Sequence, residues 1–172
     1  MTVSSEYQNY PKVYVETEDT SKCEEVIIEI NGKYKLTRMP IKGYKPKRIF
    51  CKKIYENIHD EVLDLESGII KKSIIVYMPW KDKYYIVERG VRSALIEAKG
   101  YEVFFNIREG DKVKEKDKIG YVVSKKFEVR TIRSPVDGVI ALISQDVTSR
   151  NKYILSVVGE EFVREIKVER ED

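Results

Sequence analysis

The chain has 172 residues, 42% of them hydrophobic, which is typical of a globular protein with one good core or two small domains. Its 32 basic and 29 acidic residues leave a formal net charge of +3, which argues against extensive wrapping of nucleic acid because such proteins usually have a large, clustered basic excess. No run of about 18 apolar residues occurs and the first residues lack the features of an export signal, so we expect a cytoplasmic protein without a membrane-spanning segment.

Residues 24–38 give the clearest local prediction, a β-hairpin. Branched and aromatic residues alternate there with polar ones on both sides of Asn31 and Gly32, a pair that accepts the positive φ angles of a type I′ turn. Residues 39–48 contain Pro40 and Pro46 and are predicted to form a loop, because proline cannot continue a strand ladder.

Residues 48–66 predict the one substantial helix of the chain. Apolar residues recur there at spacings of three and four, and Gly68 stands where a C-terminal cap is expected. The apolar positions are Cys51, Ile54, Tyr55, Ile58, Val62 and Leu65.

Residues 69–78 and 84–88 are rich in β-branched and aromatic residues and are predicted to be strands joined by a turn at 79–82. Together with the hairpin and the helix, they predict an N-terminal α+β domain over residues 1–90. Residues 91–159 contain only short strands separated by glycine-rich and charged turns, which is typical of an all-β domain. Alternation within residues 160–169 predicts one more strand and leaves open whether it joins the first domain.

Two turns in the second half frame a hairpin, one formed by Gly110 to Val113 and the other by Ser134 to Gly138. This arrangement resembles the biotinyl/lipoyl-type barrel-sandwich hybrid, and the resemblance covers about a third of the chain. The whole sequence also resembles an uncharacterised archaeal protein family with such a C-terminal domain. The resemblance implies a mainly β protein, α+β overall, with an N-terminal α+β domain that contains one helix and a barrel-sandwich hybrid at residues 91–159.

In carrier members of that superfamily, a lysine at the hairpin tip bears biotin or lipoate. Counting forward from Val113 by the family's spacing places that lysine at Lys126, whereas counting back from Pro135 places it at Phe127. The hairpin is therefore one residue longer than a carrier hairpin, and the extra residue is expected to bulge or to redirect the tip side chain. We expect no cofactor on Lys126 or its neighbour Lys125, with covalent biotin or lipoate as the alternative.

The basic segment 42–53 gives a second candidate site, because its cations are interleaved with Tyr44 and Phe50, a pattern that can bind phosphates and stack on bases. Acidic residues between positions 56 and 66 are expected to neutralise it locally, so we treat nucleic acid as a minor alternative partner. The candidate cations are Lys42, Lys45, Lys47, Arg48, Lys52 and Lys53.

The remaining reactive residues predict no metal or catalytic site. Cys23 and Cys51 are expected to be free thiols, since they lie 28 positions apart without a His or Cys partner nearby, and His59 is expected to lie on the helix surface. No phosphate-binding loop, nucleophile elbow or HExxH motif is present, which leaves catalysis undecided but not favoured.

These observations favour a noncatalytic docking or assembly module, because the resemblance is kept in the turns and lost around the modifiable lysine. A protein partner is expected, and self-association is left open because short strands leave sheet edges that need cover.

Overall fold

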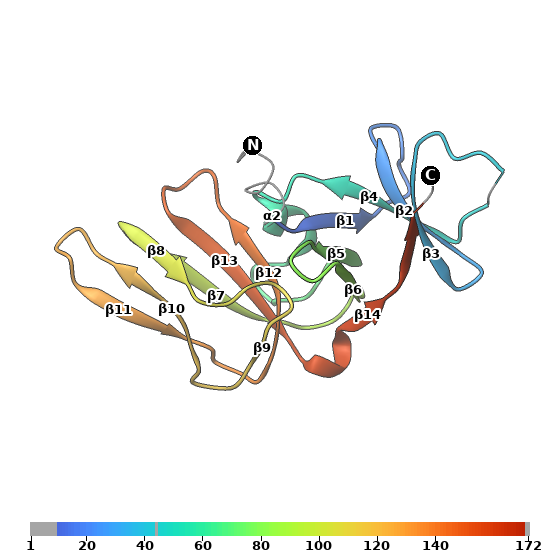
Figure 1. The fold of residues 1–172 in the computed structure, drawn as a ribbon. Coiled ribbons are helices and arrows are strands. Elements are labelled where there is room, and N and C mark those ends of the chain that lie inside the picture. Colours follow the sequence, from blue (N-terminus) through green and yellow to red (C-terminus); the bar gives the residue numbers. More distant parts are fainter. Residues whose placement is uncertain (1–9, 44, 171–172) are drawn as a thin grey trace.

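The structure is a computed structural model that describes residues 10–43 and 45–170. Residues 1–9, on which the expectation about export signals rested, and Tyr44 of the basic segment lie outside these ranges. About half of the described residues belong to strands and few to helices, which confirms the predicted mainly β class (Figure 1). Within the described ranges, no helix has the length and apolar character needed to cross a membrane.

The first half of the chain and its C-terminal segment together form an eight-stranded sheet in the order β14-β6-β5-β1-β4-β2-β3-β15. Its strands are β1 (Lys12–Glu16), β2 (Glu25–Ile30), β3 (Lys33–Arg38), β4 (Arg48–Lys53), β5 (Ile74–Met78), β6 (Lys83–Val87), β14 (Arg164–Ile166) and β15 (Val168–Arg170). The predicted hairpin at Asn31 and Gly32 is confirmed, since both residues have positive φ angles and β2 pairs with β3.

The two edges of this sheet are joined by the C-terminal segment. β14 pairs antiparallel with β6 at one edge, β15 pairs parallel with β3 at the other, and only Lys167 separates β14 from β15. The segment predicted as one strand therefore forms two short ones, after the short 3-10 helix η1 (Glu160–Phe162), and the sheet curls into a barrel-like shape. Its interior is apolar and contains Tyr14, Ile27, Tyr34, Phe50, Ile75, Tyr84, Ile86 and Ile166.

The second half of the chain forms two smaller sheets. One has three strands in the order β11-β10-β8 and the other has four in the order β7-β13-β12-β9. Their facing sides enclose a core that includes Ile119, Ile140 and Leu155. The strands are β7 (Ala94–Lys99), β8 (Glu102–Phe105), β9 (Lys112–Val113), β10 (Lys118–Val123), β11 (Val129–Arg133), β12 (Gly138–Gln145) and β13 (Lys152–Val158).

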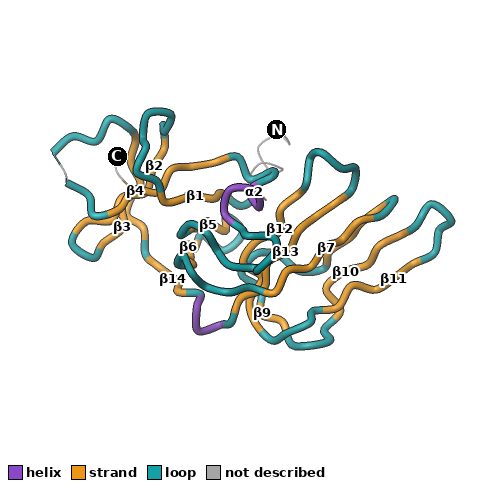
Figure 2. The backbone as a smooth tube through the Cα atoms, turned by 180° about the vertical axis from the view of Figure 1, so that it is seen from behind, coloured by secondary structure: helices purple, strands orange, loops and turns teal. Residues whose placement is uncertain are grey.

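A third apolar cluster joins the barrel-like sheet to the four-stranded sheet. Alternate residues of β1 and β5, such as Val13 and Val76, point out of the barrel-like sheet and pack with Leu142 and Ile154 of the second half. The other residues of the same strands fill the barrel interior. These central strands are thus buried on both faces, and in both views the β10–β11 hairpin extends at the end of the molecule farthest from β3 (Figures 1 and 2).

The predicted helix at residues 48–66 is wrong. Residues 48–53 form β4, a central strand between β1 and β2, and the helix α2 contains only Ile58–Val62. The three-and-four spacing failed because its members do not share a buried face: Cys51 is buried in the sheet, whereas Ile54 and Leu65 are 81% and 49% exposed. Burial within the sheet therefore overrode the helical pattern.

Gly68 has no role as the cap of that helix, which ends six residues earlier at Val62. Its φ angle is +77°, and a Cβ atom there would lie 2.3 Å from the carbonyl oxygen of Ser93. The position therefore requires glycine because two backbone segments approach closely.

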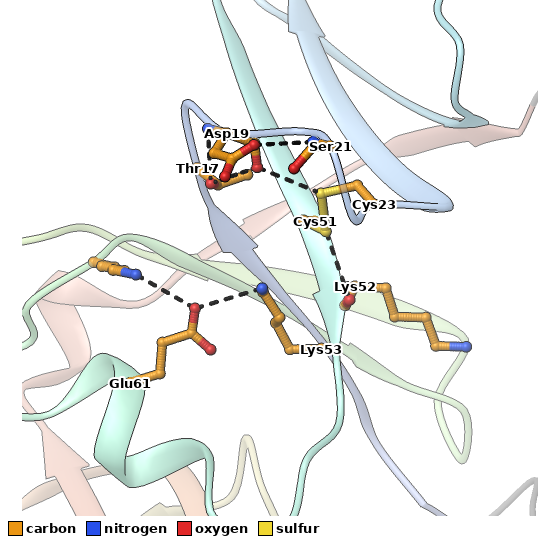
Figure 3. The surroundings of a disulfide bond; sticks show 9 residues. Thr17, Asp19, Ser21, Cys23, Cys51, Lys52, Lys53 and Glu61 are labelled. Carbon is orange, nitrogen blue, oxygen red and sulfur yellow. Dashed lines mark hydrogen bonds and ion pairs between the residues drawn. A yellow bond between two sulfur atoms is a disulfide. The ribbon is translucent and has the colours of Figure 1, made fainter.

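The prediction that Cys23 and Cys51 are free thiols is also wrong, because they form a disulfide with a Cα–Cα distance of 5.6 Å (Figure 3). Cys51 lies in β4 directly opposite Val26 of β2, and Cys23 stands in the turn before β2. Strand pairing brings the two cysteines together, and their separation of 28 positions gives no sign of that pairing. Such bonds are typical of oxidising compartments and of intracellular proteins of hyperthermophilic archaea.

Candidate functional site

The outer side of the three-stranded sheet carries an exposed aromatic pair. Phe104 of β8 lies opposite Tyr121 of β10, and their stacked rings have centroids 4.9 Å apart. These residues are 43% and 42% exposed. Phe105 and Val122 of the same strands point the other way, into the core between the sheets. Strand alternation therefore places two aromatic rings on a sheet surface that faces solvent.

Strand β11 extends this surface at the edge of the sheet. Val129 is 65% exposed, and Thr131 lies directly opposite Tyr121, so both side chains share the side that carries the aromatic pair. Within β11 only Ile132 is buried. We call Phe104, Tyr121, Val129 and Thr131 the exposed face. Isolated apolar residues are ordinary on protein surfaces, whereas large contiguous apolar patches often mark interaction surfaces, and for this reason the exposed face is the candidate site.

The turn between β10 and β11 contains Lys125 and Lys126, both exposed. The Phe127 N–H donates to the Ser124 carbonyl oxygen at 2.9 Å, and the Ser124 N–H donates to the Glu128 carbonyl oxygen at 2.9 Å. This pattern is that of a three-residue loop, a type I turn followed by a left-handed residue that forms a bulge. Phe127 occupies the left-handed position with a φ angle of +62° and is 78% exposed. The tip thus presents two neighbouring lysines beside an aromatic ring.

The hairpin that carries this turn is strongly basic. Residues 114–133 contain seven basic and three acidic residues, an excess larger than the net charge of +3 for the whole chain. The rest of the molecule is therefore close to neutral or slightly acidic in total, although the basic segment 42–53 is a second cationic stretch within it. The basic residues are Lys114, Lys116, Lys118, Lys125, Lys126, Arg130 and Arg133.

Within the basic segment 42–53, Arg48 is held by carboxylates of the barrel-like sheet. Its Nε donates to Glu29 Oε1 at 2.8 Å, and its two terminal nitrogens donate to the two carboxylate oxygens of Glu88 at 2.7 and 3.1 Å. The hydrogen bond from Arg48 lowers the pKa of Glu88. Since Glu29 is only 8% exposed, this pair stabilises the sheet, and Arg48 is engaged within the fold.

The other residues of the basic segment do not converge on an exposed ring in the described residues. Phe50 is fully buried inside the barrel and cannot stack on a base. Lys52 lies 3.9 Å from Glu25. Lys53 lies 3.7 Å from Glu61 (Figure 3). The exposed lysines of the preceding loop are Lys42, Lys45 and Lys47. Nucleic-acid binding at this segment stays a prediction.

His59 was predicted to lie on the surface, and this prediction is wrong, because it is only 2% exposed. Its Nδ1 lies 2.6 Å from Ser144 Oγ, while its own backbone N–H donates to the same oxygen at 3.2 Å. The hydroxyl thus accepts the backbone N–H of His59 and forms a second hydrogen bond with the ring nitrogen of the same residue. Ser144 is fully buried, so the pair anchors α2 to β12 and is closed to substrate. Among the described residues, no group of three or more His, Cys, Asp or Glu side chains is placed to hold a metal ion.

Glu109 is a buried carboxyl group near the contact between the two halves, only 5% exposed. The Tyr55 hydroxyl donates a hydrogen bond to its Oε2 and accepts one from the Ile143 N–H at 2.8 Å. Burial raises the pKa of Glu109, and the hydrogen bond from Tyr55 opposes this effect only in part. Burial also raises the pKa of Tyr55, which keeps its hydroxyl protonated as a donor. These groups connect segments far apart in the sequence.

Sequence reasoning did not identify the exposed face. The alternation of residues 102–105 and 118–123 places apolar residues on both sides of each strand, which by itself is equally consistent with burial on both sides. The distinction depends on whether another layer covers the sheet, and the sequence does not reveal that. The seven basic residues of the hairpin were the available signal.

Comparison with known proteins places the chain among proteins of archaea. The chain belongs to the family described as "Uncharacterized protein conserved in archaea (DUF2118)", whose model matches residues 8–160. It is also 25% identical over 164 residues to the uncharacterized protein MJ0859 of Methanocaldococcus jannaschii, and the match covers 94% of this chain and 96% of that protein. The archaeal family that the sequence resembled is thereby confirmed, and the similarity includes both halves of the fold.

The buried carboxyl group predicts a pH dependence of stability. Because burial raises the pKa of Glu109, its contribution is fully present at acidic pH and is lost as the pH rises through the folded-state pKa. Glu109→Gln keeps an acceptor for Tyr55 but removes the charge, so its free energy of unfolding should rise relative to that of the wild type between roughly pH 4 and pH 8. Urea unfolding across that range measures the difference. The exposed control Glu115→Gln should show no comparable trend, and a pH-independent difference for Glu109→Gln would contradict the assignment.

Proposed function

We propose that the chain is a noncatalytic docking module that binds a protein partner through the exposed face of β8, β10 and β11. The observation that carries this proposal is the stacked pair of Phe104 and Tyr121 on an open sheet surface. Aromatic residues provide large contact area at a small cost in conformational entropy and are enriched among residues that dominate binding energy. Strand pairing already holds the two rings in place, so little conformational entropy is lost on binding.

The proposal includes a biotinyl/lipoyl-like layout for the second half. Two small sheets pack around one apolar core, and a hairpin projects from one end of this pair, as in the superfamily that the turns resemble. The four-stranded sheet is in turn fastened to the barrel-like sheet through a shared apolar cluster. A module attached in this way would hold its exposed face in a fixed direction, which suits docking better than a mobile carrier.

The proposed module carries no prosthetic group. An attachment enzyme must recognise one lysine at a defined tip, and here Lys126 stands beside Lys125 and is followed by the exposed ring of Phe127. The left-handed conformation of Phe127 also shifts the tip relative to a hairpin without a bulge. The alternative is a covalent biotin or lipoate carrier that uses Lys126, and a measurement of mass separates the two.

Removing the aromatic pair tests the docking function. The double variant Phe104→Ser, Tyr121→Ser should lose about 2 kcal/mol or more of binding free energy toward the native partner, which is roughly thirtyfold in affinity. The partner recovered with the tagged wild-type protein from its own cell is identified by mass spectrometry, purified and titrated against both forms. The matched control Ile54→Ser removes an exposed apolar residue of the barrel-like half and should bind normally. Equal affinity of the double variant and the wild type would refute the proposal.

Intact-mass analysis tests the absence of a prosthetic group. Protein coexpressed with biotin and lipoate ligases should show the mass of the unmodified polypeptide, because the tip of the hairpin is lengthened at Phe127. A mass increment that disappears in Lys126→Arg would establish the carrier alternative, while the Lys125→Arg variant reports on the neighbouring lysine.

A further inference from the structure

Strand β11 is an unprotected edge of the three-stranded sheet. Among the described strands it pairs only with β10, whereas β10 pairs on its other side with β8. β11 has five residues, Val129–Arg133, and contains no proline. Its pairing with β10 is regular from Val129 to Ile132, and the register shifts only at the end of the pair, between Lys118 and Gly120 of β10. An edge of this kind presents backbone donors and acceptors to which another extended chain can pair.

The register identifies the backbone groups that point outward. The Glu128 carbonyl oxygen accepts from Ser124, and the Ser134 N–H donates to the Asp117 carbonyl oxygen, so these even-numbered positions face the neighbouring segments. Because adjacent residues of a strand alternate in the direction of their backbone groups, Val129, Thr131 and Arg133 direct their N–H and C=O groups away from β10. The free edge therefore offers hydrogen-bonding groups at every second residue along β11.

The side chains beside these groups specify a charge for the incoming segment. By alternation along β11, Arg133 belongs to the side of Thr131 and Val129, and its Nη1 donates to the Lys116 carbonyl oxygen at 2.9 Å. Arg130 belongs to the opposite side and is also exposed. A strand added at this edge would place its side chains directly opposite them, where opposite charges stabilise a pair and like charges destabilise it. The remaining basic residues of the hairpin would add a longer-range attraction for anionic groups.

We propose that β11 accepts an extended, acidic segment of a protein partner as an additional strand, with carboxylates opposite Arg130 and Arg133 and an apolar residue opposite Val129. This inference rests on the proposed docking function and specifies its partner. The exposed face would continue over the added strand, so that Phe104 and Tyr121 contact the body of the partner while β11 fixes its register.

Charge argues against a second copy of the chain as the occupant. Pairing β11 with its own copy would bring together two hairpins that each carry seven basic and three acidic residues. Arginine on an edge strand opposes such self-pairing and leaves the edge available to an acidic segment. Two features favour a polypeptide over a nucleic acid: the outward backbone groups of β11, and the acidic residue Glu102 on the same side of the sheet as Tyr121.

Binding of synthetic peptides to variants of the β11 edge tests the inference. The probes are a short capped peptide in which glutamate alternates with valine, and a counterpart with lysine in place of glutamate. Thr131→Pro removes an outward-pointing N–H without removing a bond to β10, and proline is tolerated at such edge positions. Thr131→Val is the matched control because it keeps both the N–H and the branched side chain. We expect the acidic peptide to bind the wild type and Thr131→Val, and to bind Thr131→Pro at least about tenfold more weakly.

A charge-reversal variant and hydrogen exchange of the backbone amides provide two independent tests of strand addition. The double variant Arg130→Glu, Arg133→Glu should bind the acidic peptide at least about tenfold more weakly and gain affinity for the lysine peptide. In the wild type, the acidic peptide should slow hydrogen exchange at the amides of Val129, Thr131 and Arg133. This second reading holds even if Thr131→Pro folds poorly. Binding of the acidic peptide without protection of these amides, or no binding at all, would overturn the inference.

The docking function and strand addition can fail separately. If Thr131→Pro keeps the native partner while loss of Phe104 and Tyr121 abolishes binding, docking stands and strand addition is wrong. If neither change weakens binding of the native partner, the docking function and strand addition are both wrong. A short oligothymidine serves as the probe for nucleic acid: Tyr121-dependent binding of it without binding of the acidic peptide would assign the surface to single-stranded nucleic acid and overturn the inference.

Discussion

The structure depends above all on the apolar contact between the barrel-like sheet and the four-stranded sheet. Val13, Val76 and Val87 of the first pack against Leu142 and Ile154 of the second, within a cluster of fully or nearly fully buried side chains. Because β1, β5 and β6 are apolar on both faces, they fill the barrel interior and this contact at once. A buried hydrogen bond from Tyr55 to Glu109 lies at the same contact. This contact therefore fixes the direction in which the basic hairpin projects from the barrel-like half.

Local signals in the sequence were reliable where a turn required special backbone geometry. Asn31 and Gly32 indicated a hairpin because few residue pairs accept positive φ angles, and the structure has those angles. The helix at 48–66 was predicted incorrectly because the apolar spacing that suggested it begins at Cys51, which is buried between neighbouring strands. The disulfide between Cys23 and Cys51 depends on the same pairing. Contacts between distant segments decided these cases, and a single sequence contains little information about them.

For the candidate site, the sequence supplied the residues but not their environment. It placed Lys125 and Lys126 in the turn of a hairpin, where the structure also has them, and a mismatch of one residue drew attention to Phe127. It could not show that Phe104 and Tyr121 lie on an uncovered sheet surface, because exposure depends on the layers that surround a strand. Arg48 illustrates the converse: a cation that suggested a phosphate site is bound by Glu29 and Glu88.

Docking by strand addition requires that β11 have one free edge. Residue-resolved amide hydrogen exchange of the isolated protein tests it most directly, because exchange reports whether each N–H is hydrogen-bonded. The amides of Arg130 and Ile132, which face β10, should exchange slowly, whereas those of Val129, Thr131 and Arg133 should exchange at rates close to those of an unstructured chain. Equal protection of all five amides would show that the edge is already covered and that β11 cannot accept a further strand.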